Sequence, residues 1–249
     1  MERAIFYDQI ALFYRDLSKP RENYINTVNH IVINEVTLSE TPARSMLDIG
    51  AADGVRGIQI AQQIGIQELT LLEPSQEMVA LINNRIIPQN IQQTVIQGTA
   101  ESLSISIDKN AKFDVITVLW NVLGHIPDHQ SRISVLNNLK QKLSKNGKLY
   151  FDLNNRYNVS AYGKTIVFNN YMNDKNNPSK SFNDNGNIFY DMHVNDKKVP
   201  AWGHVFSSQE AKTLIHESGL NLVKQYLIDY DNGKLVASFG QGNPLFICN

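Results

Sequence analysis

The stretch Met46-Leu47-Asp48-Ile49-Gly50-Ala51-Ala52-Asp53-Gly54-Val55-Arg56-Gly57 decides the fold of this chain. Apolar residues lead to an acidic residue, a turn of small residues follows, and then comes a run typical of a helix. Glycine and alanine in such a turn let a ligand approach the backbone, because a larger side chain would block it. The free N–H groups of the helix that follows can bind polar or anionic ligand atoms.

A second acidic residue stands at the spacing that a nucleotide-like ligand requires. The apolar run Leu69–Leu72 ends in Glu73, about twenty residues after the turn, where an acid can accept hydrogen bonds from both hydroxyls of a ribose. The two elements together predict a cofactor that resembles a nucleotide.

Composition indicates a globular protein without a strong charge. The chain has 249 residues, 42% hydrophobic and 19% charged, with a formal net charge of −1. It therefore has no overall basic field that would attract nucleic acid or an acidic membrane. Cys248 is its single cysteine, so an internal disulfide is excluded and a cytoplasmic location is expected. No signal-peptide core or bilayer-length apolar run is visible, so we expect no membrane partner. For the oligomeric state we expect a monomer or a homodimer.

The order of the predicted elements favours one doubly wound α/β domain over residues 1–249. Apolar runs typical of buried parallel strands alternate with helical patterns, which implies right-handed crossovers and a mostly parallel sheet with helices on both faces. The expected strands are 45–50, 68–73, 91–97, 113–119, 148–153, 220–230 and 244–248, and the expected helices are 54–64, 75–87, 128–143 and 207–218.

Two segments lie outside this alternation. Residues 1–44 carry apolar residues at helical spacing and predict an N-terminal helical cap, either a simple cover of the core or a lid that closes Tyr7 and Tyr14 over the cofactor. Residues 155–204 predict an insertion that covers the substrate. Its short aromatic runs 166–168 and 188–190 favour a few short strands, and a loop is expected around 172–187. We expect the segment Leu235–Phe239 to extend the last strand.

The first motif resembles that of the class I S-adenosylmethionine-dependent methyltransferases. The family pattern is D/E-x-G-x-G-x-G, and Asp48 to Gly54 match it except for Ala52 at the middle glycine. A nicotinamide-binding turn would need G-x-G-x-x-G, and its second glycine is missing here.

The resemblance continues along the chain and is strong for residues 45–153. Glu73 stands at the family's ribose-binding acid, and Gly98–Leu103 resembles the G-D-A-x-x-L turn that holds the adenine, with Thr99 in place of the acid. Phe113–Ile116 is similar to the start of the fourth strand, and Leu143–Leu149 to the turn before the fifth. The family fold has seven strands in the order 3-2-1-4-5-7-6, the last of them antiparallel.

The resemblance implies S-adenosylmethionine as the cofactor. The implied cofactor-binding residues are Tyr14, Asp48, Gly50, Ala51, Ala52, Gly54, Glu73, Pro74, Thr99, Ala100, Glu101, Leu119 and Trp120.

The acceptor side is less determined by the sequence. His125 follows the fourth strand and could act as a general base or as an orienting donor. His125, Asp128 and His129 do not match a standard ligand spacing, so no metal is expected. The expected substrate contacts are Tyr7, Asn121, Asn155, Arg156, Tyr157 and His204.

The sequence thus predicts a methyltransferase with a small-molecule acceptor. One alternative is a tRNA or other RNA methyltransferase, which the near-neutral charge disfavours. A second is a catalytically silent S-adenosylmethionine-binding regulatory domain, and a nicotinamide oxidoreductase is the most remote.

Overall fold

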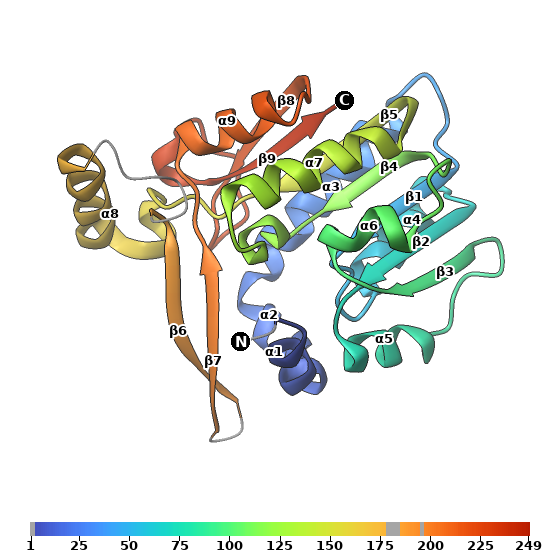
Figure 1. Ribbon diagram of the computed structural model, residues 1–249, viewed down its shortest axis with the longest axis horizontal. Coiled ribbons are helices and arrows are strands. Elements are labelled where there is room, and N and C mark those ends of the chain that lie inside the picture. The colour runs from blue at the N-terminus through green and yellow to red at the C-terminus, as the bar shows by residue number, and fades with distance from the viewer. Residues whose placement is uncertain (1–2, 178–184, 195–196) are drawn as a thin grey trace.

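A seven-stranded sheet forms the centre of the computed structural model, which describes residues 3–177, 185–194 and 197–249 (Figure 1). Its strand order is β3-β2-β1-β4-β5-β9-β8, which confirms the order expected from the sequence. The strands are β1 (Ser45–Ile49), β2 (Glu68–Glu73), β3 (Gln92–Gln97), β4 (Phe113–Val118), β5 (Leu143–Asp152), β8 (Leu222–Ile228) and β9 (Asn243–Cys248).

The first five strands are parallel, and β9 runs antiparallel between β5 and β8. All six residues of β9 are buried, as are five of the six in β4. This burial explains the nearly continuous apolar runs in the sequence, because helices cover both faces of the central strands.

Two hydrophobic layers enclose the sheet. On one face α6 (Leu103–Ser106), α7 (His129–Lys142) and α9 (Ser208–Glu217) pack on the strands. On the other face lie α3 (Glu22–Thr37), α4 (Val55–Ile64) and α5 (Gln76–Asn83) (Figure 1). None of the helices in the described part of the chain has both the length and the apolar character needed to cross a membrane.

The N-terminal segment is helical, as predicted, and lies near the carboxyl ends of the strands. It comprises α1 (Arg3–Ile10), a 3-10 turn, α2 (Tyr14–Ser18) and a second 3-10 turn before α3. Asp8 fastens α1 to the start of α5, since its carboxylate accepts hydrogen bonds from the Ser75 hydroxyl at 2.6 Å and the Glu77 N–H at 3.2 Å.

The insertion contains a helix that the sequence did not predict. Helix α8 (Val159–Asn176) covers the run 166–168, which was expected to be extended, and the first part of the loop expected at 172–187. No described residue of α8 is buried, so the helix has no apolar face that periodicity could reveal. Its start is fixed by Asn158, whose side chain accepts hydrogen bonds from the N–H groups of Ser160 and Ala161.

The rest of the insertion is a hairpin of β6 (Asn187–Val194) and β7 (Lys197–His204). The strand expected at 188–190 is therefore confirmed, whereas residues 178–184 of the predicted loop lie outside the described residues. The expected extension of the last strand over 235–239 is wrong: Leu235 forms only an isolated bridge with Ile228, and a 3-10 turn follows at Phe239–Gln241.

The layer between the sheet and α7 predicts a large stability effect for one substitution. Leu139 is completely buried in this layer, so Leu139→Ala should lower the free energy of unfolding by about 2–5 kcal/mol. Leu235→Ala, at a residue that is 59% exposed, should change it by less than about 0.5 kcal/mol. Urea unfolding measures both, and equal effects would contradict the assignment of the core.

Candidate functional site

A cavity of about 920 Å³ lies at the carboxyl ends of the central strands. The turn after β1, the end of β2 and the segment after β4 form its floor, while α1, α2 and the β6–β7 hairpin form its walls. Ligands bind at this edge of open α/β sheets because the loops that follow the strands diverge there.

The turn after β1 holds a conformation that only small residues tolerate. Gly50 has a φ of 68°, and a Cβ there would lie 2.6 Å from Val122 Cγ2. Ala52, at the position of the missing middle glycine, still adopts the left-handed conformation with a φ of 50°. The alanine therefore keeps the shape of the turn at some cost in backbone strain.

Glu73 ends β2 with its carboxylate facing this turn. One oxygen accepts a hydrogen bond from the Ala52 N–H at 2.8 Å and the other from the Ser75 N–H at 3.0 Å. Burial raises the pKa of the Glu73 carboxyl to about 7, although the two backbone hydrogen bonds lower it. Each oxygen keeps a free lone pair that could accept a ligand hydroxyl.

A second left-handed turn follows β4. Trp120 and Asn121 have φ values of 66° and 59°. The carboxylate of Asp152, at the end of β5, accepts hydrogen bonds from both of their backbone N–H groups and from the Tyr24 hydroxyl. Burial raises the pKa of the Asp152 carboxyl. The hydrogen bonds of this fully buried group hold the backbone of Trp120, whose side chain lines the cavity.

Aromatic side chains form one wall. The Tyr7 hydroxyl lies 3.0 Å from Nε2 of His125, and their rings meet edge to face at 5.6 Å. Tyr14 meets Trp120 in the same way, also at 5.6 Å. Burial raises the pKa of Tyr7 far above its usual value, so this hydroxyl keeps its proton at neutral pH.

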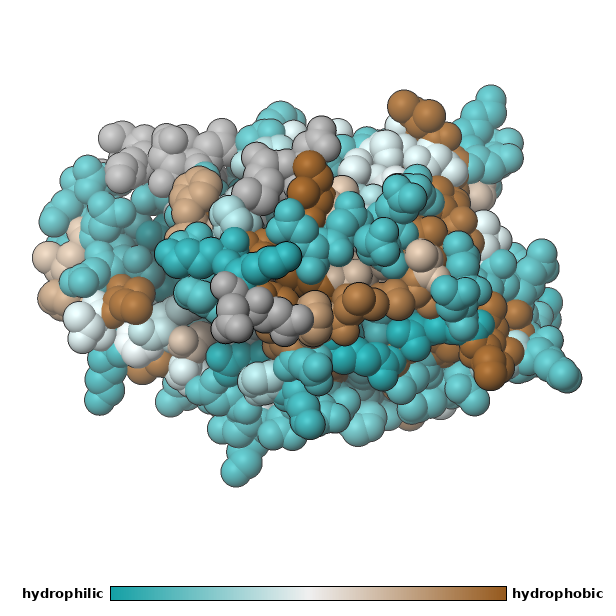
Figure 2. Space-filling model, turned by 90° about the horizontal axis from the view of Figure 1, so that it is seen from below, coloured by the Kyte–Doolittle hydropathy of each residue, from teal (hydrophilic) through white to brown (hydrophobic). Residues whose placement is uncertain are grey.

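The hairpin closes the cavity with alternate residues of β6. Ile188, Tyr190 and Met192 line the cavity, as expected for side chains two apart on one strand face. Phe189, between them, is 80% exposed. Seen from below, hydrophobic residues show between hydrophilic ones on the face that carries the N-terminal helices and the hairpin (Figure 2).

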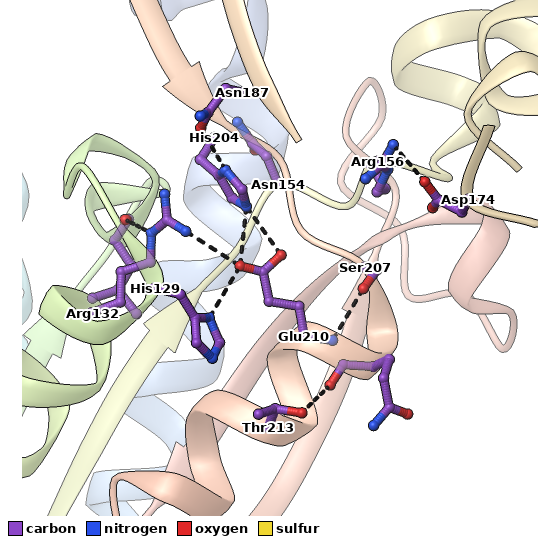
Figure 3. A network of polar contacts seen from close by, with 12 residues as sticks. His129, Arg132, Asn154, Arg156, Asp174, Asn187, His204, Ser207, Glu210 and Thr213 are labelled. Atoms are coloured by element: carbon purple, nitrogen blue, oxygen red, sulfur yellow. Dashed lines mark hydrogen bonds and ion pairs between the residues drawn. The ribbon is translucent and has the colours of Figure 1, made fainter. Parts of the chain in front are cut away.

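A buried polar network holds the base of the hairpin (Figure 3). Nε2 of His204 lies 3.0 Å from Glu210 Oε2, and its Nδ1 lies 2.8 Å from Asn187 Oδ1. Arg132 pairs with Glu210 at 3.3 Å and donates to the Leu123 carbonyl at 3.2 Å. Burial lowers the pKa of His204 to about 3, so its imidazole is neutral, and its Nε2 is engaged with Glu210 of α9.

A smaller cavity of about 380 Å³ adjoins the first and shares Tyr14, Gly50 and Trp120 with it. Arg56 and Asn29 line this second cavity. Nη2 of Arg56 and Oδ1 of Asn29 are buried without a hydrogen-bond partner in the described part of the chain. A buried donor and a buried acceptor that lack partners are unfavourable unless a ligand satisfies them.

Most of the expected cofactor residues converge on these cavities. Asp48 and Ala51 line only the second cavity, and the Asp48 carboxylate accepts a hydrogen bond from the Thr117 hydroxyl at 2.6 Å. Gly54 lines neither and precedes α4 with a φ of 78°. The expected residues that line the main cavity are Tyr14, Gly50, Ala52, Glu73, Pro74, Thr99, Ala100, Glu101, Leu119 and Trp120.

The expected acceptor residues divide into two groups. Tyr7, Asn121, His125 and His204 line the main cavity. Asn121 uses its amide inside the protein, since Nδ2 donates to the His204 carbonyl at 3.1 Å and Oδ1 accepts from the Asn154 N–H at 2.9 Å.

The lining of the cavity does not include the other three expected contacts, Asn155, Arg156 and Tyr157, which follow β5. Arg156 pairs with Asp174 of α8 at 3.1 Å, and the Tyr157 hydroxyl donates to the same carboxylate. The Asn155 amide donates to the carbonyls of Phe239 and Gly242. These side chains fasten the insertion to the body of the protein, and we do not retain them as substrate contacts.

Several residues that shape the site were missed in the sequence. Asp152 and Tyr24 hold the turn after β4, and Tyr190 and Tyr230 line the cavity. Asp152 ends a buried strand just as Asp48 and Glu73 do, a signal that could have identified it. Among the described residues no group of three or more His, Cys, Asp or Glu side chains could hold a metal ion.

A family model described as "Methyltransferase domain" matches residues 32–225. The chain is similar to the CcbJ methyltransferase from Streptomyces caelestis at 13% identity and a TM-score of 0.67, over 98% of this chain and 97% of that one. It is also similar to an S-adenosylmethionine-dependent methyltransferase from Clostridium acetobutylicum at 13% identity and a TM-score of 0.63, over 98% of both chains.

A third similar structure is the magnesium protoporphyrin IX methyltransferase (ChlM) from Synechocystis with bound SAH. The identity is 12% and the TM-score 0.58, over 93% of this chain and 86% of that one. At these identities the structures show a shared fold. The search of curated proteins finds no match to the chain.

The buried carboxyl of Glu73 predicts a pH dependence of stability. Its pKa is about 7 in the folded protein against an ordinary 4.5, so between these values the folded protein holds a proton that the unfolded chain releases. This group should therefore lower the free energy of unfolding as the pH rises through that window, by at most roughly 3 kcal/mol. Urea unfolding at several pH values measures this free energy. Glu73→Gln should reduce its decline with pH, whereas Glu77→Gln, at an exposed residue of α5, should not. Equal slopes in all three proteins would contradict the assignment.

Proposed function

Because the chain belongs to the methyltransferase-domain family, we propose that it transfers the methyl group of S-adenosylmethionine to a small-molecule acceptor. Family membership and fold confirm the resemblance to class I S-adenosylmethionine-dependent methyltransferases that the motif residues carried. The acceptor class is the part that we infer.

The size of the main cavity and the elements that cover it carry this proposal. Its volume of about 920 Å³ lies at the upper end of the range of about 300–1,000 Å³ for small-molecule sites. The N-terminal helices and the hairpin cover it, and such a cover favours a compact acceptor over a long polymer. Similar structures bear the names of enzymes for a magnesium porphyrin and for a glycopeptide, which supports an acceptor of low molecular weight.

The residues of the two cavities fit the cofactor. Glu73 would accept hydrogen bonds from the two ribose hydroxyls. Gly50, which has no side chain, would let the cofactor approach the backbone of the turn after β1 closely. The adenine would lie against Thr99–Glu101, which line the same cavity. Arg56 and Asn29 offer a donor for the carboxylate and an acceptor for the ammonium group of the methionine end.

The cofactor supplies a methyl group on a positively charged sulfur, which needs no further activation. The protein has to align the acceptor atom with that methyl group and exclude water, and alignment alone can contribute on the order of 7–11 kcal/mol. Tyr7, Tyr14 and the hairpin residue Tyr190 line the cavity in which this alignment would take place.

The placement of the methionine end predicts a selective loss of affinity. Arg56→Met should weaken the binding of S-adenosylmethionine roughly ten- to hundredfold, because a hydrogen bond to a charged group is lost. It should leave the affinity for methylthioadenosine, which lacks the amino-acid end, nearly unchanged. Calorimetric titration measures both affinities, and Arg44→Met, at an exposed residue before β1, is the matched control. An equal loss for both ligands would contradict the placement.

Methyl transfer from radiolabelled S-adenosylmethionine tests the acceptor class. The protein is incubated in parallel with a low-molecular-weight metabolite extract and with total RNA. We expect label in the metabolite fraction. Label only in the RNA would overturn the small-molecule proposal. Binding of the cofactor with no transfer to either fraction would favour a silent binding domain.

A further inference from the structure

Aromatic side chains from several segments line the main cavity, and one of them, Tyr7, lies beside His125. Tyr7 and Tyr14 come from the N-terminal segment, Tyr190 from β6, Tyr230 from the segment after β8, and Trp120 from the turn after β4. Tyr14 and Trp120 already meet edge to face, and a flat aromatic ring would add to such an arrangement. The shape and the chemistry of this wall favour a planar acceptor.

The charges of the lining disfavour a cationic acceptor. Of the described residues that line the cavity, only Glu73 and Glu101 carry carboxylates, and both lie at the end bounded by β2 and the turn after β3. An ammonium group bound away from that end would be desolvated with none of the carboxylates of the described lining beside it. A neutral hydroxyl does not incur that cost.

Tyr7 and His125 form a pair that can accept a proton. In the tautomer in which Nε2 accepts, the Tyr7 hydroxyl donates to it across 3.0 Å. Tyr7 holds its own proton at neutral pH because burial disfavours the tyrosinate. It can therefore accept a proton from an acceptor hydroxyl only while it passes its own proton to His125. An imidazole can hold that proton near neutral pH.

Building on the proposed methyl transfer, we propose that the acceptor is an aromatic compound with an ionisable hydroxyl and that Tyr7 relays its proton to His125. The acceptor O–H bond breaks and its proton moves to the Tyr7 oxygen, while the Tyr7 proton moves to Nε2 of His125. The acceptor oxygen forms a bond to the methyl carbon as the carbon–sulfur bond breaks. The products are an aryl methyl ether, a neutral thioether and an imidazolium, which returns its proton to water.

The relay predicts that the effect of Tyr7→Phe depends on the acidity of the acceptor. Probes are a series of para-substituted phenols from 4-methylphenol to 4-nitrophenol. For weakly acidic phenols we expect Tyr7→Phe to lower kcat about 100-fold, the low end of the range for general base catalysis. For 4-nitrophenol, which is ionised near neutral pH, we expect a loss of no more than about threefold. A merely structural role of Tyr7 would lower kcat equally for all phenols, which would overturn the relay.

Two further variants sharpen this test. Tyr171→Phe makes the same change on α8, at a residue that is 54% exposed, and should match the unmodified protein. His125→Gln should reproduce the acidity dependence of Tyr7→Phe, and the double variant should be no slower than either single one, because the two residues act as a unit. Additive losses would contradict a shared proton path.

A binding experiment without cofactor gives a readout apart from turnover. The pH at which bound 4-nitrophenol becomes the coloured phenolate should be lower than in water for the unmodified protein, and this shift should be lost in Tyr7→Phe. If S-adenosylmethionine binds and other acceptors are methylated but no phenol is bound or methylated, the acceptor class is overturned while the proposed function stands. If S-adenosylmethionine does not bind, the proposed function itself fails.

Discussion

The buried carboxylate of Asp152 is the constraint on which the arrangement of the site depends. It accepts hydrogen bonds from the backbone of Trp120 and Asn121 and from the Tyr24 hydroxyl, and so joins the turn after β4, the end of β5 and α3. A left-handed conformation at a residue other than glycine costs on the order of 1–3 kcal/mol, and two such residues stand in sequence here. The charge-assisted hydrogen bonds to Asp152 offset that cost. The result is an indole fixed at the boundary between the two cavities.

The hairpin that covers the cavity is anchored to this same region. Asn121 donates to the carbonyl of His204 at the base of the hairpin, and Arg132 joins the turn after β4 to Glu210 and thereby to the His204 imidazole. The N-terminal helices are held separately, by Asp8 at α5 and by the Arg15–Asp53 ion pair at the turn after β1, where the two groups lie 2.8 Å apart. Hydrogen bonds and an ion pair thus join the elements that cover the cavity to the turns that form its floor.

The sequence was informative where the site is local and uninformative where distant segments meet. Asp48, Gly50 and Glu73 stand at or just after the ends of strands at recognisable spacings, and the family resemblance that they carry implied the strand order. Arg156 and Tyr157 also follow a strand, yet both side chains pair with Asp174 and neither lines the cavity. That partner stands on α8, a helix without a buried face, which no periodic pattern could reveal. The contact between Tyr7 and His125 joins residues 118 positions apart, and only the folded chain brings them together.

Thermal unfolding in the presence of cofactors tests the central claim most directly. S-adenosylmethionine, its demethylated product and NAD are each added at high excess, and a ligand at one hundred times its dissociation constant should add about 2.7 kcal/mol to the stability. We predict that the first two raise the unfolding temperature and that NAD does not. Stabilisation by NAD alone, or by none of the three, would contradict the assignment of these cavities to S-adenosylmethionine.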